Sequence, residues 1–158
     1  MLSALVVSNH IIERANRDKI KDLTPMKLQK LLYFVFGEYL AASPDGQPLF
    51  SERFAKWKFG PVLPSVYQEF KSFGANNITS YYMNSNGEIL VPNDEVESNN
   101  LFFQVFERVW EKYKNYTGVE LSEITHRQDP WKNAVDNCEI RNDDIREFFQ
   151  KQGVSDDR

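Results

Sequence analysis

The stretch TPMKLQKLLYFVFGEYL, residues 24–40, decides the fold. A threonine directly before a proline is typical of a helix start, because Thr24 can cap the helix and Pro25 has no N–H to leave unpaired. Apolar residues then recur three and four positions apart, and aromatic residues occupy the remaining sides, which is the composition of a fully buried helix. The pattern predicts a central buried helix over residues 25–41.

Other periodic segments predict further helices around this one, at about residues 3–17, 64–72, 98–114, 121–126 and, capped by Asn142, 142–149. The strand-like spacing of apolar residues over 49–57 predicts a short strand or an extended arm, and Gly60 with Pro61 predicts a sharp corner after it. Residues 73–97 contain Asn84-Ser85-Asn86-Gly87, which predicts a β-hairpin. The expected fold class is mainly α (α+β), a compact helical bundle around residues 25–41 with a small β-sheet or hairpin.

The chain has 158 residues, of which 41% are hydrophobic, so one domain with a packed core is expected over residues 1–152. Residues 153–158 are predicted to form a disordered tail. The single cysteine, Cys138, cannot form an intrachain disulfide and is expected to be a small buried or half-buried residue. No run approaches the roughly 20 apolar residues of a membrane span, and no leader pattern is seen at the N-terminus, so we expect a cytoplasmic protein without a membrane partner.

Charge is unevenly divided along the chain, whose net charge is −4. Residues 1–93 carry 10 Lys/Arg against 8 Asp/Glu, a balance of +2, whereas residues 94–158 carry 9 against 15, a balance of −6. The acidic total argues against general nucleic-acid binding. We expect the basic residues of the first part to form a solvated face. Lys27 and Lys30, three apart on the central helix, are also candidates for an interaction surface.

Catalytic motifs are missing from the sequence: it contains no phosphate-binding loop, zinc-binding pattern or nucleophile elbow. With two histidines and one cysteine, neither a metal nor another cofactor is expected. His10 is predicted to be a surface or capping residue. His126 could act as a base with Thr125 and Asp129, but we favour a structural role in which its ring bonds the turn before Pro130 and Trp131. The expectation is therefore that the chain is not an enzyme.

Several short motifs occur together, in one order: TPMKLQKLLYF at 24–34, PLF at 48–50, FAKWKFGPV at 54–62, VY at 66–67, LSEITH at 121–126 and PW at 130–131. In this combination the chain resembles the Panacea domain family, also called SocA-like or phage-associated GepA-like, over about residues 3–135. The resemblance implies an antitoxin of a bacterial or prophage toxin–antitoxin system, which neutralises a cognate toxin by direct binding. It also implies that the toxin is encoded by the adjacent gene, with a homodimer or a hetero-oligomer with the toxin both left open.

The residues that carry the resemblance are the candidates for partner binding or for making the fold: Lys27, Gln29, Lys30, Tyr33, Trp57, Gly60, Pro61, Thr125, His126, Pro130 and Trp131. The motifs do not distinguish those two roles. The acidic segment 136–158 matches no motif, and we hypothesise that it selects the toxin. Three alternatives stay open: a proteolytic adaptor for the toxin, a small hydrolase-like enzyme using His126, and a DNA-binding autoregulator.

Overall fold

The computed structural model of the chain describes residues 2–156. The described helices and strands are α1 (Ala4–Arg17), α2 (Pro25–Ala42), β1 (Ala55–Trp57), β2 (Gly60–Val62), α3 (Pro64–Phe70), α4 (Asn100–Tyr113), α5 (Gly118–His126), α6 (Asp129–Lys132) and α7 (Asn142–Asp156), with short 3₁₀ turns at Lys71–Phe73 and Glu97–Asn99. The mainly helical fold class with a small sheet is confirmed.

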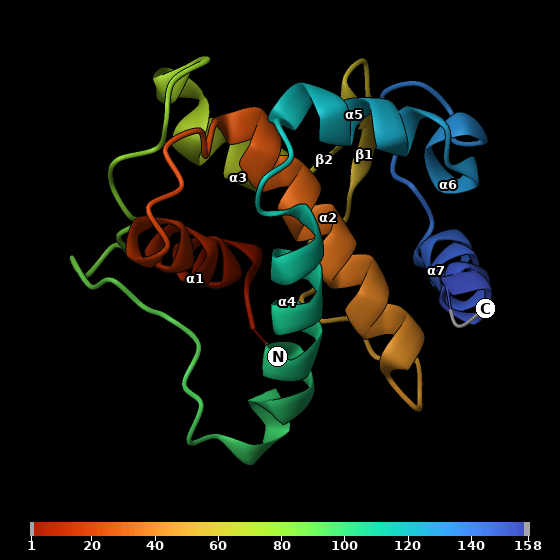
Figure 1. Cartoon of the computed structure of the whole chain (residues 1–158), viewed down its shortest axis with the longest axis horizontal. Helices are drawn as coiled ribbons and strands as arrows, with labels where there is room; N and C mark the ends of the chain where they lie inside the picture. Colours follow the sequence, from red (N-terminus) through yellow and green to blue (C-terminus); the bar gives the residue numbers. More distant parts are fainter. Residues whose placement is uncertain (1, 157–158) are drawn as a thin grey trace.

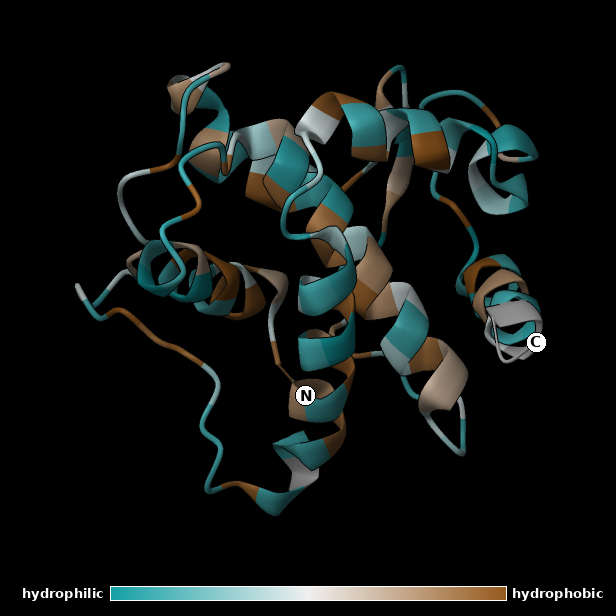
Figure 2. Ribbon diagram, viewed as in Figure 1, coloured by the Kyte–Doolittle hydropathy of each residue, from teal (hydrophilic) through white to brown (hydrophobic). Residues whose placement is uncertain are grey.

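Helix α2 lies at the centre, as its sequence predicted (Figure 1). The Thr24 hydroxyl accepts a hydrogen bond from the backbone of Lys27 and so caps the helix, and Pro25 is the first helical residue. Helices α1, α4, α5 and α7 all contact α2, and every residue from 27 to 37 is buried. Because all its sides are covered, α2 keeps hydrophobic residues around its axis, whereas the side of α4 turned to the viewer in Figure 2 is hydrophilic.

Aromatic packing joins α2 to its neighbours. The rings of Phe34 and Tyr113 stack with their centroids 4.4 Å apart, which fixes α4 against α2. On the other side, α7 brings the Phe149 ring so close to Gly37 that a Cβ atom there would lie 2.2 Å from Phe149 Cε2. A larger residue at position 37 would push α7 away from α2.

The acidic segment 136–158, for which we hypothesised a partner-specific role, contributes to the core of the molecule. Its residues Ile140, Ile145 and Phe149 are at most 2% exposed. Just before α7 the segment pairs with the edge of β1, where the Lys56 N–H donates to Cys138 O at 2.9 Å. The Cys138 side chain is exposed, so the expectation that Cys138 is buried or half-buried is wrong.

Strands β1 and β2 form an antiparallel pair in which Trp57 lies opposite Gly60 and Ala55 opposite Val62. The sharp corner expected around Gly60 and Pro61 is the end of this hairpin. Gly60 has a φ of +116°, which residues with a side chain rarely adopt.

The β-hairpin predicted within residues 73–97 is wrong, because no strand forms in this described segment. The turn at its tip does form, with the Asn84 N–H donating to Glu88 O at 2.9 Å. The two arms bond to the buried Asn9 side chain of α1 instead of to each other: Asn9 donates to Tyr82 O and Leu90 O and accepts from the Tyr82 N–H. The Asn9 side chain thus satisfies backbone groups that would otherwise pair between the two strands of a hairpin.

Smaller differences occur towards the C-terminus. Helix α5 begins at Gly118, earlier than predicted, because Thr117 and Glu120 form a reciprocal capping box. Asn142 is the first residue of α7 and its buried Oδ1 has no hydrogen-bond donor among the described residues, so its predicted role as the cap is wrong. Within the predicted tail 153–158, α7 continues through residue 156, and residues 157–158 lie outside the described part of the chain.

Candidate interaction site

Most of the candidate residues meet at the β1–β2 hairpin. Helix α2 lies along one side of the hairpin, and α5 with α6 lies along the other. The residues gathered there are Gln29, Lys30, Trp57, Gly60, Pro61, Thr125, His126 and Trp131. Lys27 and Tyr33 lie elsewhere on α2, and Pro130 is buried at the start of α6.

Gln29 holds the end of the hairpin to α2. Its side chain donates to Leu63 O at 3.0 Å and accepts from Leu63 N at 2.8 Å, which reproduces the pairing that a neighbouring strand would give. All four atoms are in buried surroundings, where unpaired polar groups are costly. Gln29 therefore fixes the point at which β2 ends and α3 begins.

Lys30 crosses beneath the hairpin. Its side chain is buried, and Nζ donates to Pro61 O at 2.9 Å. A Cβ atom on Gly60 would lie 2.7 Å from both Lys30 Cε and Thr125 Oγ1, so only glycine allows the hairpin to approach this closely. Burial lowers the pKa of Lys30 from its ordinary value of 10.5 to about 7, because the charged form loses its hydration.

Lys27 is also buried, and its Nζ binds Asp22 Oδ1 at 2.8 Å and Lys114 O at 2.6 Å. The expectation of a solvated face is therefore wrong for both Lys27 and Lys30. The reason is the central position of α2, where even charged residues are covered by neighbouring elements and bond to their backbone carbonyls.

Tyr33 lies deeper in the core, where its ring packs edge-on against Phe54 and Phe149 at 5.2 and 5.6 Å. Its hydroxyl is buried without a hydrogen-bond partner among the described residues, and burial raises the pKa of Tyr33. A side chain in this position contributes packing inside the molecule and does not reach its surface.

His126 and Trp131 hold the hairpin from the side of α5 and α6. His126 Nε2 lies 2.8 Å from Lys58 O, and Trp131 Nε1 donates to Trp57 O at 2.9 Å, with the two rings 4.4 Å apart. His126 thus has a structural contact, as favoured from the sequence, but it bonds the hairpin and not the turn before Pro130, so that detail is corrected.

In the catalytic hypothesis, Thr125, His126 and Asp129 would act together, but each of these side chains has a different partner. Thr125 Oγ1 donates to Ser122 O at 2.8 Å, and Asp129 lies 4.0 Å from the Lys132 ammonium. With His126 bonded to the hairpin, each group is engaged separately. The arrangement offers no hydrogen-bonded relay among Thr125, His126 and Asp129 in the described structure.

His10 is not the surface or capping residue expected from the sequence. Its ring packs edge-on against Phe102, Phe103 and Phe106, with the closest centroid at 4.4 Å. Burial is the largest cause that lowers the pKa of His10 from 6.5 to about 4. Because α1 packs on the aromatic face of α4, His10 serves there as a neutral aromatic residue.

An apolar groove opens beside the hairpin, between the first turns of α2 and α3. Its volume is about 420 Å³, and its lining includes Leu28, Val62, Val66 and Phe70. At its edges Phe59 is 54% exposed and Tyr67 39% exposed, so two exposed aromatic side chains adjoin the apolar lining, and contiguous apolar surface of this kind marks interaction sites. Sequence reasoning missed this groove, because its walls come from separate elements; the available signal was Phe59, an aromatic residue at the tip of a turn.

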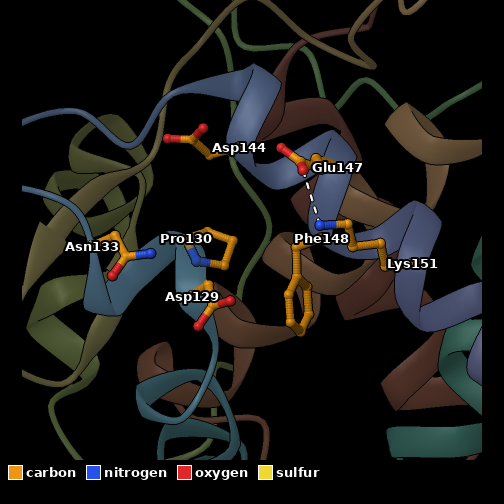
Figure 3. Close-up of a pocket in the computed structure, with 7 residues that line it drawn as sticks. All are labelled: Asp129, Pro130, Asn133, Asp144, Glu147, Phe148 and Lys151. Carbon is orange, nitrogen blue, oxygen red and sulfur yellow. Dashed lines mark ion pairs between the residues drawn. The ribbon is translucent and has the colours of Figure 1, made fainter.

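A second, smaller hollow of about 240 Å³ lies between α6 and α7 (Figure 3). Pro130, Asp129, Asp144 and Glu147 line it, and Glu147 is paired with Lys151 at 3.0 Å. Among the described residues no group of three or more His, Cys, Asp or Glu side chains is placed to hold a metal ion. The described helices also contain none long and apolar enough to cross a membrane.

These features define a mainly helical protein whose characteristic residues build a hairpin onto a buried central helix. Residues 28–132 match the family described as "Antitoxin SocA-like, Panacea domain", and the chain belongs to this family. A relative from Caulobacter vibrioides (strain NA1000 / CB15N), named Antitoxin SocA, is 39% identical over 77 residues, which cover 49% of this chain and 39% of that protein. The chain thus aligns with less than half of that relative's length. No solved structure matches it.

Proposed function

We propose that the chain is an antitoxin that neutralises a cognate toxin by binding it directly. The observation that carries the proposal is the family match over residues 28–132, together with the relative named Antitoxin SocA. The toxin is a protein partner encoded by the adjacent gene. The chain acts on it stoichiometrically and without chemistry of its own.

The division between buried and exposed residues supports a binding role. Gln29, Lys30 and Trp131 are bonded to the hairpin and hold it in place. Phe59 and Tyr67, beside that hairpin, are exposed at an apolar groove. A rigid scaffold that presents aromatic side chains is the usual construction of a protein-binding surface.

Co-expression tests the proposal. The adjacent gene is placed under an inducible promoter, and growth is recorded with and without this chain, followed by purification through a tag on the chain. We expect induction alone to stop growth, and co-expression to restore it with both proteins in one complex. A neighbour that is harmless when expressed alone, or rescue without a complex, would contradict direct neutralisation.

The variant His126→Ala separates binding from catalysis in the same assay. It removes the imidazole that would act as the base in a catalytic mechanism, while Lys58 O, its partner, is at an exposed residue. Rescue is expected at equal levels of folded protein, because the hairpin keeps its hydrogen bonds to Gln29, Lys30 and Trp131. Loss of rescue by a folded His126→Ala chain that still binds the toxin would favour an enzyme.

A further inference from the structure

We infer that the groove formed by α2, the β1–β2 hairpin and α3 receives a segment of the toxin in which an apolar or aromatic side chain is flanked by carboxylates. This rests on the proposed function and names the surface and the chemistry of the partner segment.

The shape and lining of the groove favour an apolar side chain at its centre. Leu28 and Val66 are at most 1% exposed and form part of an apolar lining, and Met26 lies at the start of the α2 wall. Across the opening, the Tyr67 ring packs edge-on against Trp57 with centroids 5.1 Å apart, so Tyr67 is held in place although it is exposed. An aromatic side chain that is already ordered loses little entropy on binding, which makes it a good anchor.

The charges at the groove favour an acidic partner. The basic residues that line it are Lys30, whose amine is buried against Pro61 O, together with Lys58 and Lys71, and no described Asp or Glu lines it. Lys58 and Lys71 are exposed, and neither is paired with a carboxylate of the described residues; Lys58 Nζ lies 5.4 Å from the centroid of the Phe59 ring.

This positive lining contrasts with the chain as a whole, whose net charge is −4. At long range the net negative charge disfavours an acidic segment, whereas the exposed Lys58 and Lys71 attract one locally at the groove. Such local complementarity selects the docking site and the partner more than it adds affinity.

The smaller hollow between α6 and α7 provides the comparison. It is lined by Asp129, Asp144 and Glu147 with Lys151, so its acidic groups are in excess and would repel the same segment. An acidic, apolar-centred segment therefore fits the groove beside the hairpin and not the hollow.

The test measures binding of the purified chain to the protein encoded by the adjacent gene by calorimetry. Tyr67→Ala removes the ordered anchor, and the double variant Lys58→Glu, Lys71→Glu reverses the charges. Val135→Ala and Arg53→Glu are matched controls, because Val135 is 69% exposed, the Arg53 side chain is 53% exposed, and neither lines the groove. Urea unfolding of every variant verifies that it is folded.

We expect each groove variant to weaken binding at least about tenfold, the loss typical of an aromatic anchor or a reversed charge, while the controls bind like the wild type. Wild-type affinity should also fall as salt is raised, and the double lysine variant should lose most of that dependence.

Folded groove variants that bind as tightly as the wild type would overturn the inference and leave the proposed function standing. Light scattering of the free chain tests whether a second copy of the chain occupies the groove instead. A dimer that Tyr67→Ala dissociates without changing toxin binding would assign the groove to that second copy and would also overturn the inference. A wild-type chain that neither binds nor rescues would refute the proposed function, and the groove assignment with it.

Discussion

Gly60→Ala should be among the most destabilising single-methyl changes in this protein. The backbone at Gly60 has a φ of +116°, and a non-glycine residue in such a conformation costs about 1–3 kcal/mol. The new Cβ would also lie 2.7 Å from Lys30 Cε and from Thr125 Oγ1. Overpacking of this kind adds about 1–3 kcal/mol, so we expect a total loss in the free energy of unfolding of about 4 kcal/mol.

Gly74→Ala is the matched control. Gly74 has a φ of +60°, and nothing lies within 4 Å of a Cβ atom there, so only the backbone term remains, about 2 kcal/mol. In urea titrations with a slope of about 2 kcal/mol per molar, the two variants should differ in midpoint by about 1 M. Equal midpoints for Gly60→Ala and Gly74→Ala would refute the close packing of the hairpin on Lys30 and Thr125.

Three further changes test other parts of the fold. Gln29→Leu leaves the buried N–H and C=O of Leu63 without partners and should lower the free energy of unfolding, measured in urea, by about 3 kcal/mol. The control Gln68→Leu, at an exposed residue, should change it by less than about 0.5 kcal/mol. Equal effects would contradict the role of Gln29 in bridging α2 and the hairpin. Because the pKa of Lys30 is lowered from 10.5 to about 7, the unfolded chain binds a proton in this range that the folded chain has released, so wild-type stability should rise with pH there. Relative to the wild type, Lys30→Met should therefore lose stability from pH 7 to 10, by at most about 1.4 kcal/mol per pH unit, and a pH-independent difference would contradict the burial of a titrating amine. Deletion of residues 139–158 removes three core side chains and should abolish the cooperative thermal unfolding transition. Deletion of residues 153–158, the control, should leave that transition in place. A folded chain ending at residue 138 would show that α7 is dispensable.

Local signals were sufficient to predict the central helix. The Thr24 cap, the Pro25 start and the apolar residues around the helix are all contained in one stretch, and the structure confirms the helix at Pro25–Ala42. Helix α4 was likewise predictable, because Phe102 and Val105 begin a one-sided apolar face that the structure buries. The family resemblance was also recognisable from short motifs, and the match over residues 28–132 confirms it.

Features that depend on contacts between distant elements were not predictable. Lys27 and Lys30 were predicted to be solvated because lysine is a charged residue. In the structure, neighbouring elements cover α2 and supply carbonyl partners for both amines. The hairpin expected near Asn84 failed because a side chain of α1, Asn9, takes the hydrogen bonds of both arms. The groove needs α2, β1–β2 and α3 in one place, which no single stretch of sequence indicates.

The central claim, neutralisation by contact, is tested most directly by titrating purified chain against the activity of the purified toxin in a protease-free assay. We predict a loss of toxin activity that is complete at a fixed molar ratio of the two proteins and does not depend on incubation time. Inhibition by far less than one chain per toxin molecule, or no inhibition until a cellular protease is added, would contradict it in favour of an enzyme or an adaptor.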